Sequence, residues 1–244
     1  MPPRLLRLDP ATPLQPMELD PADFQSPLPQ QGLHVAFEDP AIGLTVGLWE
    51  TTPMQEAFGP YPGDEVVFIL DGAFAMIDQD GRGTPAHAGQ AVALRSGAPL
   101  SWMQAGPLRK VFLTLLPPDA SPASLPAAEG GVVVLDPGDA FTDADPVTVS
   151  DSGARQRDRE VFTNAAGTLT LGQWDTGPLK TDLYPFPCHE LARVIEGEVI
   201  ITAADGCAET FGPGDIFFIP AGTPTRWHVP THLRKHYATV TPKA

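Results

Sequence analysis

The sequence predicts an all-β protein made of two similar halves, and three observations lead to this prediction. Glycine (23) and proline (29) are numerous and spread along the 244 residues, and both residue types interrupt long regular elements. No segment keeps the 3.6-residue apolar period of an amphipathic helix. The third observation is an internal repeat, whose two copies consist of short apolar runs separated by turns.

The repeat appears when the chain is shifted by 125 residues against itself. Residues 44–115 then superpose on residues 169–240 without a gap, with about 20 identical pairs. The identical pairs include Trp49 with Trp174, Glu65 with Glu190, Gly72 with Gly197, Trp102 with Trp227, and Arg109-Lys110 with Arg234-Lys235. A constant offset over such a span indicates duplication of one structural unit.

The domain boundaries follow from the repeat. Leu8-Asp9-Pro10 resembles Leu135-Asp136-Pro137, which indicates that a leader segment belongs to each copy. The stretch 117–131 is rich in proline, alanine and serine and has no periodic pattern, as expected of a linker. We therefore predict two domains, 1–125 and 126–244.

Each copy has the pattern of short strands. Two apolar runs around Asp71-Gly72 form a hairpin signal, and the same signal recurs around Glu196-Gly197. Further short apolar runs follow in both copies, at 91–94, 110–116, 216–219 and 235–240. About eight short strands per copy favour a sandwich or barrel, in which few strand edges stay open.

Charge and composition exclude several classes of function. The net charge of −15 leaves no basic face for nucleic acid, and it would repel an anionic membrane surface. Two cysteines do not form a disulfide framework, and neither a signal peptide nor a transmembrane run is apparent. We expect a cytoplasmic protein, monomeric or homodimeric, whose partner is a small molecule.

Two motifs in each copy resemble the cupin superfamily. Glu65 with Gly72, and Glu190 with Gly197, stand in the relation of the carboxylate and glycine of the first cupin motif. The segment from Gly214 through Pro220 to Gly222 resembles the second motif. The resemblance implies a bicupin: two tandem RmlC-like jelly-roll barrels, also called double-stranded β-helices. Within cupins, the chain looks like the subfamily of ureidoglycine aminohydrolase and the ethanolamine-utilisation cupins.

The resemblance also identifies the positions of the usual metal ligands, where most ligands are missing. In the second copy the histidine positions hold Tyr184, Phe186 and Thr225, and only the carboxylate Glu190 is kept. In the first copy the three positions hold Gly59, Tyr61 and Leu100, beside Glu65. The standard pattern therefore predicts no metal.

The favoured hypothesis is a metal-free pocket in the second barrel that binds, or turns over, a small polar metabolite. Its predicted catalytic residue is Glu190, as a general acid or base or as a ligand anchor. The predicted ligand-binding residues are Tyr184, Phe186, Arg226, Trp227, Lys235 and Tyr237. The first barrel is then a structural partner, in which Glu65 is a structural carboxylate.

Two alternatives stay open. A metal-dependent hydrolase or lyase of the ureidoglycine aminohydrolase type would use a non-standard set of His189, Glu190, His228 and His236 to bind Mn, Fe, Ni or Zn. Strand alternation, however, predicts that the three histidines point outward. The other alternative is a purely structural bicupin. Lys235 with Arg234 could also meet an anionic ligand, whereas recurrence of the pair as Arg109-Lys110 favours a shared structural role.

Overall fold

The computed structural model describes residues 3–116, 118, 131–150 and 153–241 of the chain. Nearly all regular structure in this part is β, and all its strand pairs are antiparallel. The exception is one short 3-10 helix, η1 (Pro21–Asp23). None of the helical segments described could cross a membrane, because none is long and apolar enough. The predicted all-β class is confirmed.

The chain forms two compact units. The N-terminal unit comprises Pro10–Asp136, and the C-terminal unit comprises Met1–Asp9 together with Pro137–Ala244. Each contains one seven-stranded and one five-stranded sheet, and two antiparallel sheets facing each other are the basic arrangement of a jelly roll.

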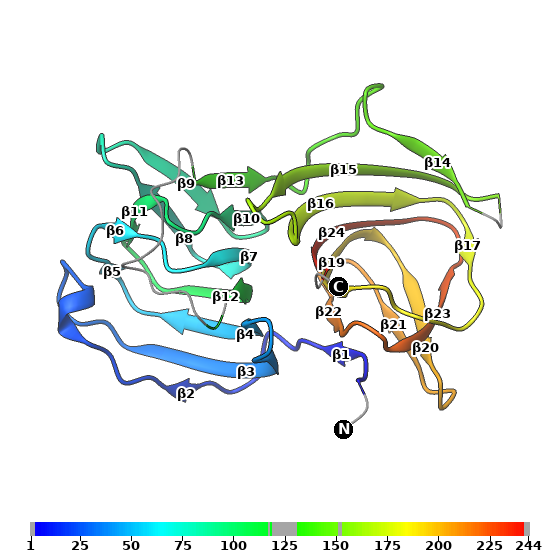
Figure 1. The fold of residues 1–244 in the computed structure, drawn as a ribbon, viewed down its shortest axis with the longest axis horizontal. Helices are drawn as coiled ribbons and strands as arrows, with labels where there is room; N and C mark the ends of the chain where they lie inside the picture. Colours follow the sequence, from blue (N-terminus) through cyan, green and yellow to red (C-terminus); the bar gives the residue numbers. More distant parts are fainter. Residues whose placement is uncertain (1–2, 117, 119–130, 151–152, 242–244) are drawn as a thin grey trace. The chain divides into compact units, whose positions relative to one another are not determined.

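In the N-terminal unit, strands β7 and β12 lie in the middle of the seven-stranded sheet (Figure 1). The order of this sheet is β13 (Val132–Leu135), β10 (Ala91–Leu94), β7 (Asp64–Asp71), β12 (Leu108–Leu115), β4 (Leu44–Thr51), β3 (Gln31–Asp39) and β2 (Gln15–Pro16). The five-stranded sheet runs β5 (Met54–Gln55), β11 (Pro99–Gln104), β8 (Ala73–Ile77) and β9 (Gly83–His87), and β6 (Gly59–Pro60) also pairs with β11.

The C-terminal unit repeats this arrangement with strands that the repeat predicts to be equivalent. Its seven-stranded sheet has the order β1 (Leu6–Arg7), β22 (Ile216–Ile219), β19 (His189–Gly197), β24 (Leu233–Val240), β16 (Leu169–Thr176), β15 (Arg155–Thr163) and β14 (Val147–Val149). Its five-stranded sheet runs β17 (Leu179–Lys180), β23 (Pro224–Val229), β20 (Val199–Ala203) and β21 (Ala208–Phe211), and β18 (Tyr184–Pro185) also pairs with β23.

The leader strands are exchanged between the two copies of the repeat. β1 precedes the first copy in sequence but pairs with β22 of the second, where Leu6 lies opposite Phe218. β13 precedes the second copy but pairs with β10 of the first. The compact units therefore differ from the predicted domains 1–125 and 126–244 in both leaders, while the predicted boundary itself lies outside the described residues.

An arginine in each unit anchors the chain that follows the leader strand. Arg109 donates to the backbone carbonyl oxygens of Pro10 (2.8 Å) and Thr12 (2.6 Å). Arg234 donates to the carbonyl oxygens of Pro137 (2.8 Å) and Asp139 (2.5 Å). The matched contacts explain why the arginine recurs in the repeat, and they support a structural role.

Both sheets of a unit contribute to its core. In the N-terminal unit, Val67 and Ile69 of β7 pack with Phe74 of β8 and Trp102 of β11, and all four are buried. Because strand neighbours face opposite sides of a sheet, the inward faces of β7 and β19 also carry the carboxylates Glu65 and Glu190. The architecture thus places an equivalent carboxylate on the inward face of the seven-stranded sheet in each unit.

Candidate functional site

The C-terminal unit contains a pocket of about 650 Å³ between its two sheets. Six of the residues predicted to form a site line it: Tyr184, Phe186, Glu190, Trp227, Lys235 and Tyr237. Arg226 does not line it, because Arg226 is exposed and, as the strand neighbour of Trp227, points to the other face of β23. A volume of this size suits a small organic molecule.

An ion pair lies at the buried end of the pocket. The Lys235 ammonium donates to Glu190 Oε1, and the two side chains are only 5% and 7% exposed. The same ammonium lies over the aromatic rings of Trp174 (5.2 Å to the centroid) and Trp227 (4.8 Å). Removing two charges from water is costly, and here their mutual attraction and the negative ring faces offset that cost.

Aromatic side chains form the walls. Phe186 stacks on Trp227 with centroids 5.9 Å apart and ring planes 11° apart. Tyr184 lies against Phe186 at 6.1 Å, and Trp174 meets Trp227 edge to face at 6.5 Å. Burial, with Glu190 nearby, raises the pKa of Tyr184 to about 12, so its hydroxyl stays protonated near neutral pH. The walls therefore offer ring faces and a neutral hydroxyl.

Carboxylates lie at the mouth. Asp158 and Glu160 of β15 are exposed and line the pocket, together with Asp182. Asp158 accepts a hydrogen bond from the Tyr237 hydroxyl at 2.6 Å. Burial, reinforced by this bond to a carboxylate, holds the pKa of Tyr237 well above its ordinary value.

Sequence reasoning missed Asp158 and Glu160 because β15 lies upstream of the aligned repeat. A signal was nevertheless present in β15, where Gln156, Asp158 and Glu160 stand two residues apart. Residues at this spacing share one face of a strand, and all three line the pocket. A strand with polar residues on its inward face is typical of a sheet that borders a pocket rather than a core.

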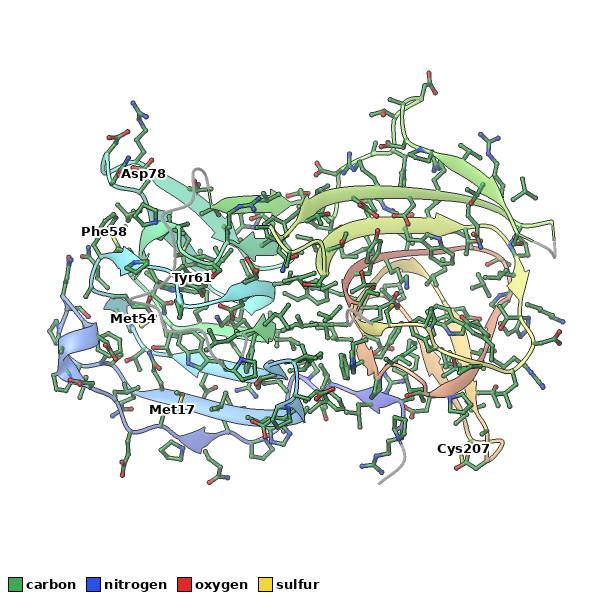
Figure 2. The ribbon with its side chains drawn as sticks, viewed as in Figure 1. Met17, Met54, Phe58, Tyr61, Asp78 and Cys207 are labelled. Atoms are coloured by element: carbon green, nitrogen blue, oxygen red, sulfur yellow. The ribbon has the colours of Figure 1, made fainter. Side chains whose placement is uncertain are left out.

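The N-terminal unit has the same ion pair in a different setting. Lys110 Nζ donates to Glu65 Oε1 at 2.8 Å and lies over the rings of Trp49 (4.8 Å) and Trp102 (4.5 Å). The Tyr61 hydroxyl, labelled in Figure 2, donates to the other oxygen of Glu65. Both carboxylate oxygens of Glu65 therefore have a partner inside the unit.

Aromatic packing occupies the centre of the N-terminal unit. The ring of Trp102 stacks on Phe74 at 3.8 Å, and its indole N–H donates to Gln104 at 2.9 Å. A pocket of about 770 Å³ in this unit lies beside Glu50 and Arg109, and neither residue of the internal ion pair lines it.

The residues of the C-terminal unit do not fit a transition-metal site. The Lys235 ammonium donates to Glu190 Oε1, so a cation already occupies the carboxylate oxygen that a metal ion would need. Nowhere in the described part of the chain do three His, Cys, Asp or Glu side chains gather in a group that could hold a metal ion. The alternative ligand set is also divided: His189 and His236 alternate with the inward residues of β19 and β24, and His228 lies on the far face of β23.

Comparison with known proteins agrees with this fold. Residues 163–237 match the model of the EutQ-like cupin domain. No curated protein matches the chain.

Three solved structures illustrate the likeness in fold. A protein of unknown function of the DUF861 family from Pseudomonas syringae pv. tomato is 23% identical, with a TM-score of 0.75, over 98% of this chain and 100% of that one. A cupin 2 conserved barrel domain protein from Leptotrichia buccalis is 11% identical, with a TM-score of 0.60, over 86% and 89%. The salicylate 1,2-dioxygenase of Pseudoaminobacter salicylatoxidans is 12% identical, with a TM-score of 0.54, over 82% and 69%. The chain therefore has a cupin fold, and its residues 163–237 are similar to the EutQ-like cupin domain.

Proposed function

We propose that this chain is a bicupin that binds a small polar metabolite in its C-terminal barrel, and that its N-terminal barrel has a structural role. The observation that carries the proposal is the difference between two equivalent ion pairs. The pair of Glu190 and Lys235 borders a pocket of about 650 Å³, whereas Glu65 and Lys110 are enclosed by aromatic packing. A buried charged pair at the end of an open pocket is a typical ligand anchor.

Binding is supported more directly than turnover. Glu190, the predicted acid or base, is held by Lys235, and Trp227 lines the same pocket. The pocket therefore offers recognition groups of three kinds: a carboxylate, a cation and ring faces. Each of these recognises a polar molecule by shape and hydrogen bonding without a cofactor. The cytoplasm remains the expected location.

The test is ligand-observed NMR with a library of small polar fragments, on the full chain and on Tyr184→Ala. Tyr184 is half-buried at the pocket wall, and its equivalent in the N-terminal unit is Gly59, so the fold accommodates a small residue there. Losing one aromatic contact should weaken fragment binding roughly tenfold.

Phe58→Ala is the matched control, because Phe58 is an aromatic residue of the N-terminal unit that is 44% exposed (Figure 2). We expect fragments to bind this control and the unaltered chain equally. Absence of any bound fragment, or fragments that bind the Tyr184→Ala variant unchanged, would overturn the proposal.

A further inference from the structure

The two internal carboxylates differ in one hydrogen-bond donor. In the N-terminal unit, Glu65 accepts from Lys110 on one oxygen and from the Tyr61 hydroxyl on the other. In the C-terminal unit, Glu190 accepts from Lys235, and the residue equivalent to Tyr61 is Phe186, which has no hydroxyl.

The equivalence of Tyr61 and Phe186 rests on the backbone as well as on the repeat. The N–H of Tyr61 donates to the carbonyl of Ala98 at 2.8 Å, and that of Phe186 donates to the carbonyl of Thr223 at 2.9 Å. The carbonyl of each aromatic residue in turn accepts from a glycine, at 2.9 Å in the N-terminal unit and 2.7 Å in the C-terminal unit. The two rings therefore start from matching positions, four residues before the carboxylate.

The second oxygen of Glu190 therefore has no donor among the residues described. Glu190 is 5% exposed and lines the pocket. This oxygen is not among the fully buried polar atoms that lack a partner, so it is open to the pocket, where a donor from a ligand can replace water. The N-terminal unit shows where that donor belongs, because the Tyr61 hydroxyl occupies the corresponding place.

The charges around the pocket indicate what kind of donor fits. Four carboxylates line it, from Asp158, Glu160, Asp182 and Glu190, against the two lysines Lys180 and Lys235. Lys235 is already paired, so the balance that a ligand meets is negative. Ring faces also favour a cation, since their quadrupole is negative above the ring.

We infer that the ligand is a small organic amine, whose ammonium donates to Glu190 and whose carbon skeleton lies against Phe186 and Tyr184. The inference rests on the proposed function and specifies the class of ligand. The ammonium takes the place that the Tyr61 hydroxyl has in the N-terminal unit. The acidic residues of β15 attract the cation to the mouth of the pocket.

The test uses three probes of one size: butylammonium, 1-butanol and butyrate. Affinities are measured by ligand-observed NMR titration of the full chain. We expect butylammonium to bind at least tenfold more tightly than butanol, and butyrate to bind more weakly still.

Phe186→Tyr is the decisive variant, because it installs the hydroxyl that the N-terminal unit already carries. We expect the new hydroxyl to donate to Glu190 and to weaken butylammonium binding at least tenfold. Phe58→Tyr adds the same hydroxyl on the exposed surface of the N-terminal unit and should leave the affinity unchanged. If Phe186→Tyr folds poorly, Glu190→Gln tests the same contact, and we expect it to weaken butylammonium binding at least tenfold as well.

The outcomes separate the inference from the proposed function. Preferential binding of butyrate, lost in Lys235→Met, would overturn the amine while leaving a binding pocket. Unchanged butylammonium affinity in both Phe186→Tyr and Glu190→Gln would also overturn it. If polar fragments bind but none of the three probes does, the amine inference is refuted and the proposed binding function is kept. If no probe and no fragment binds, both proposals fail.

Discussion

The raised pKa of Glu56 predicts that the stability of the N-terminal unit depends on pH. Its carboxyl lies near the internal ion pair, between β5 and β6, and its backbone N–H donates to the carbonyl of Trp102 at 2.8 Å. Burial raises the pKa of Glu56 from 4.5 to about 7. The Lys110 ammonium opposes this rise, and the carboxylates of Glu65 and Asp23 add to it. The Tyr61 hydroxyl faces the same group.

The direction of the change in stability with pH follows from proton binding to Glu56. Between pH 4.5 and pH 7 the folded chain holds a proton on Glu56 that the unfolded chain has lost, so stability falls as pH rises through this window. The contribution is fully present below pH 4.5 and is lost above the folded pKa of about 7. A shift of this size corresponds to about 3 kcal/mol, which is an upper bound because the side chain is only half-buried.

The assay is urea unfolding of the unaltered chain and of Glu56→Gln across this pH range. We expect the two to be equally stable at the acid end, and Glu56→Gln to be more stable by up to about 3 kcal/mol at neutral pH and above. Glu18→Gln removes an exposed carboxylate of the same unit and should follow the unaltered chain. A carboxyl ¹³C titration of Glu56 with a midpoint near 4.5, or a stability difference that does not vary with pH, would refute the reasoning.

Two further pairs of variants test the packing of each unit, both by chemical unfolding. Trp102→Phe leaves the Gln104 oxygen without its indole donor, whereas the indole N–H of Trp227 is buried and has no partner among the described residues. We therefore expect Trp102→Phe to cost about 1–3 kcal/mol more than Trp227→Phe, and equal costs would contradict this assignment. Gly197 has φ +74° and a Cβ there would lie 1.9 Å from a backbone carbonyl oxygen, so Gly197→Ala should cost more than about 2 kcal/mol. Gly206 has φ +86° and open space around it, so Gly206→Ala should lower the free energy of unfolding by only about 1 kcal/mol. Similar losses of stability in Gly197→Ala and Gly206→Ala would show that the close backbone contact at Gly197 has no effect.

The sequence predicted the interior of each barrel better than its edges. Inward positions of Glu190, Trp227 and Lys235 follow from strand alternation within the repeat, and the pocket contains all three. Arg226 was predicted from its position in the second barrel, but as the strand neighbour of Trp227 it faces the other side of β23 and is exposed. Asp158 and Glu160 at the mouth were not predicted, because both precede the aligned repeat.

The sequence around the two leader strands also did not indicate that they are exchanged between the copies of the repeat. Pairing of β1 with β22 joins residues about 210 positions apart, and two residues carry too little pattern to choose a partner. The contacts that specify this pairing come from side chains instead. Arg7 lies over the ring of Phe211 at 4.1 Å and pairs with Asp215 at 2.9 Å. Such contacts become visible only when distant segments are brought together.

The leader exchange also sets an order of events during synthesis. The N-terminal unit is continuous in sequence, so it can close as soon as residue 136 has left the ribosome, while β1 waits for β22 to be made. A fragment cut between residues 125 and 126 would leave each half without its own edge strand. Expression of the C-terminal unit alone therefore calls for residues 3–9 to be supplied, either as a separate peptide or by circular permutation.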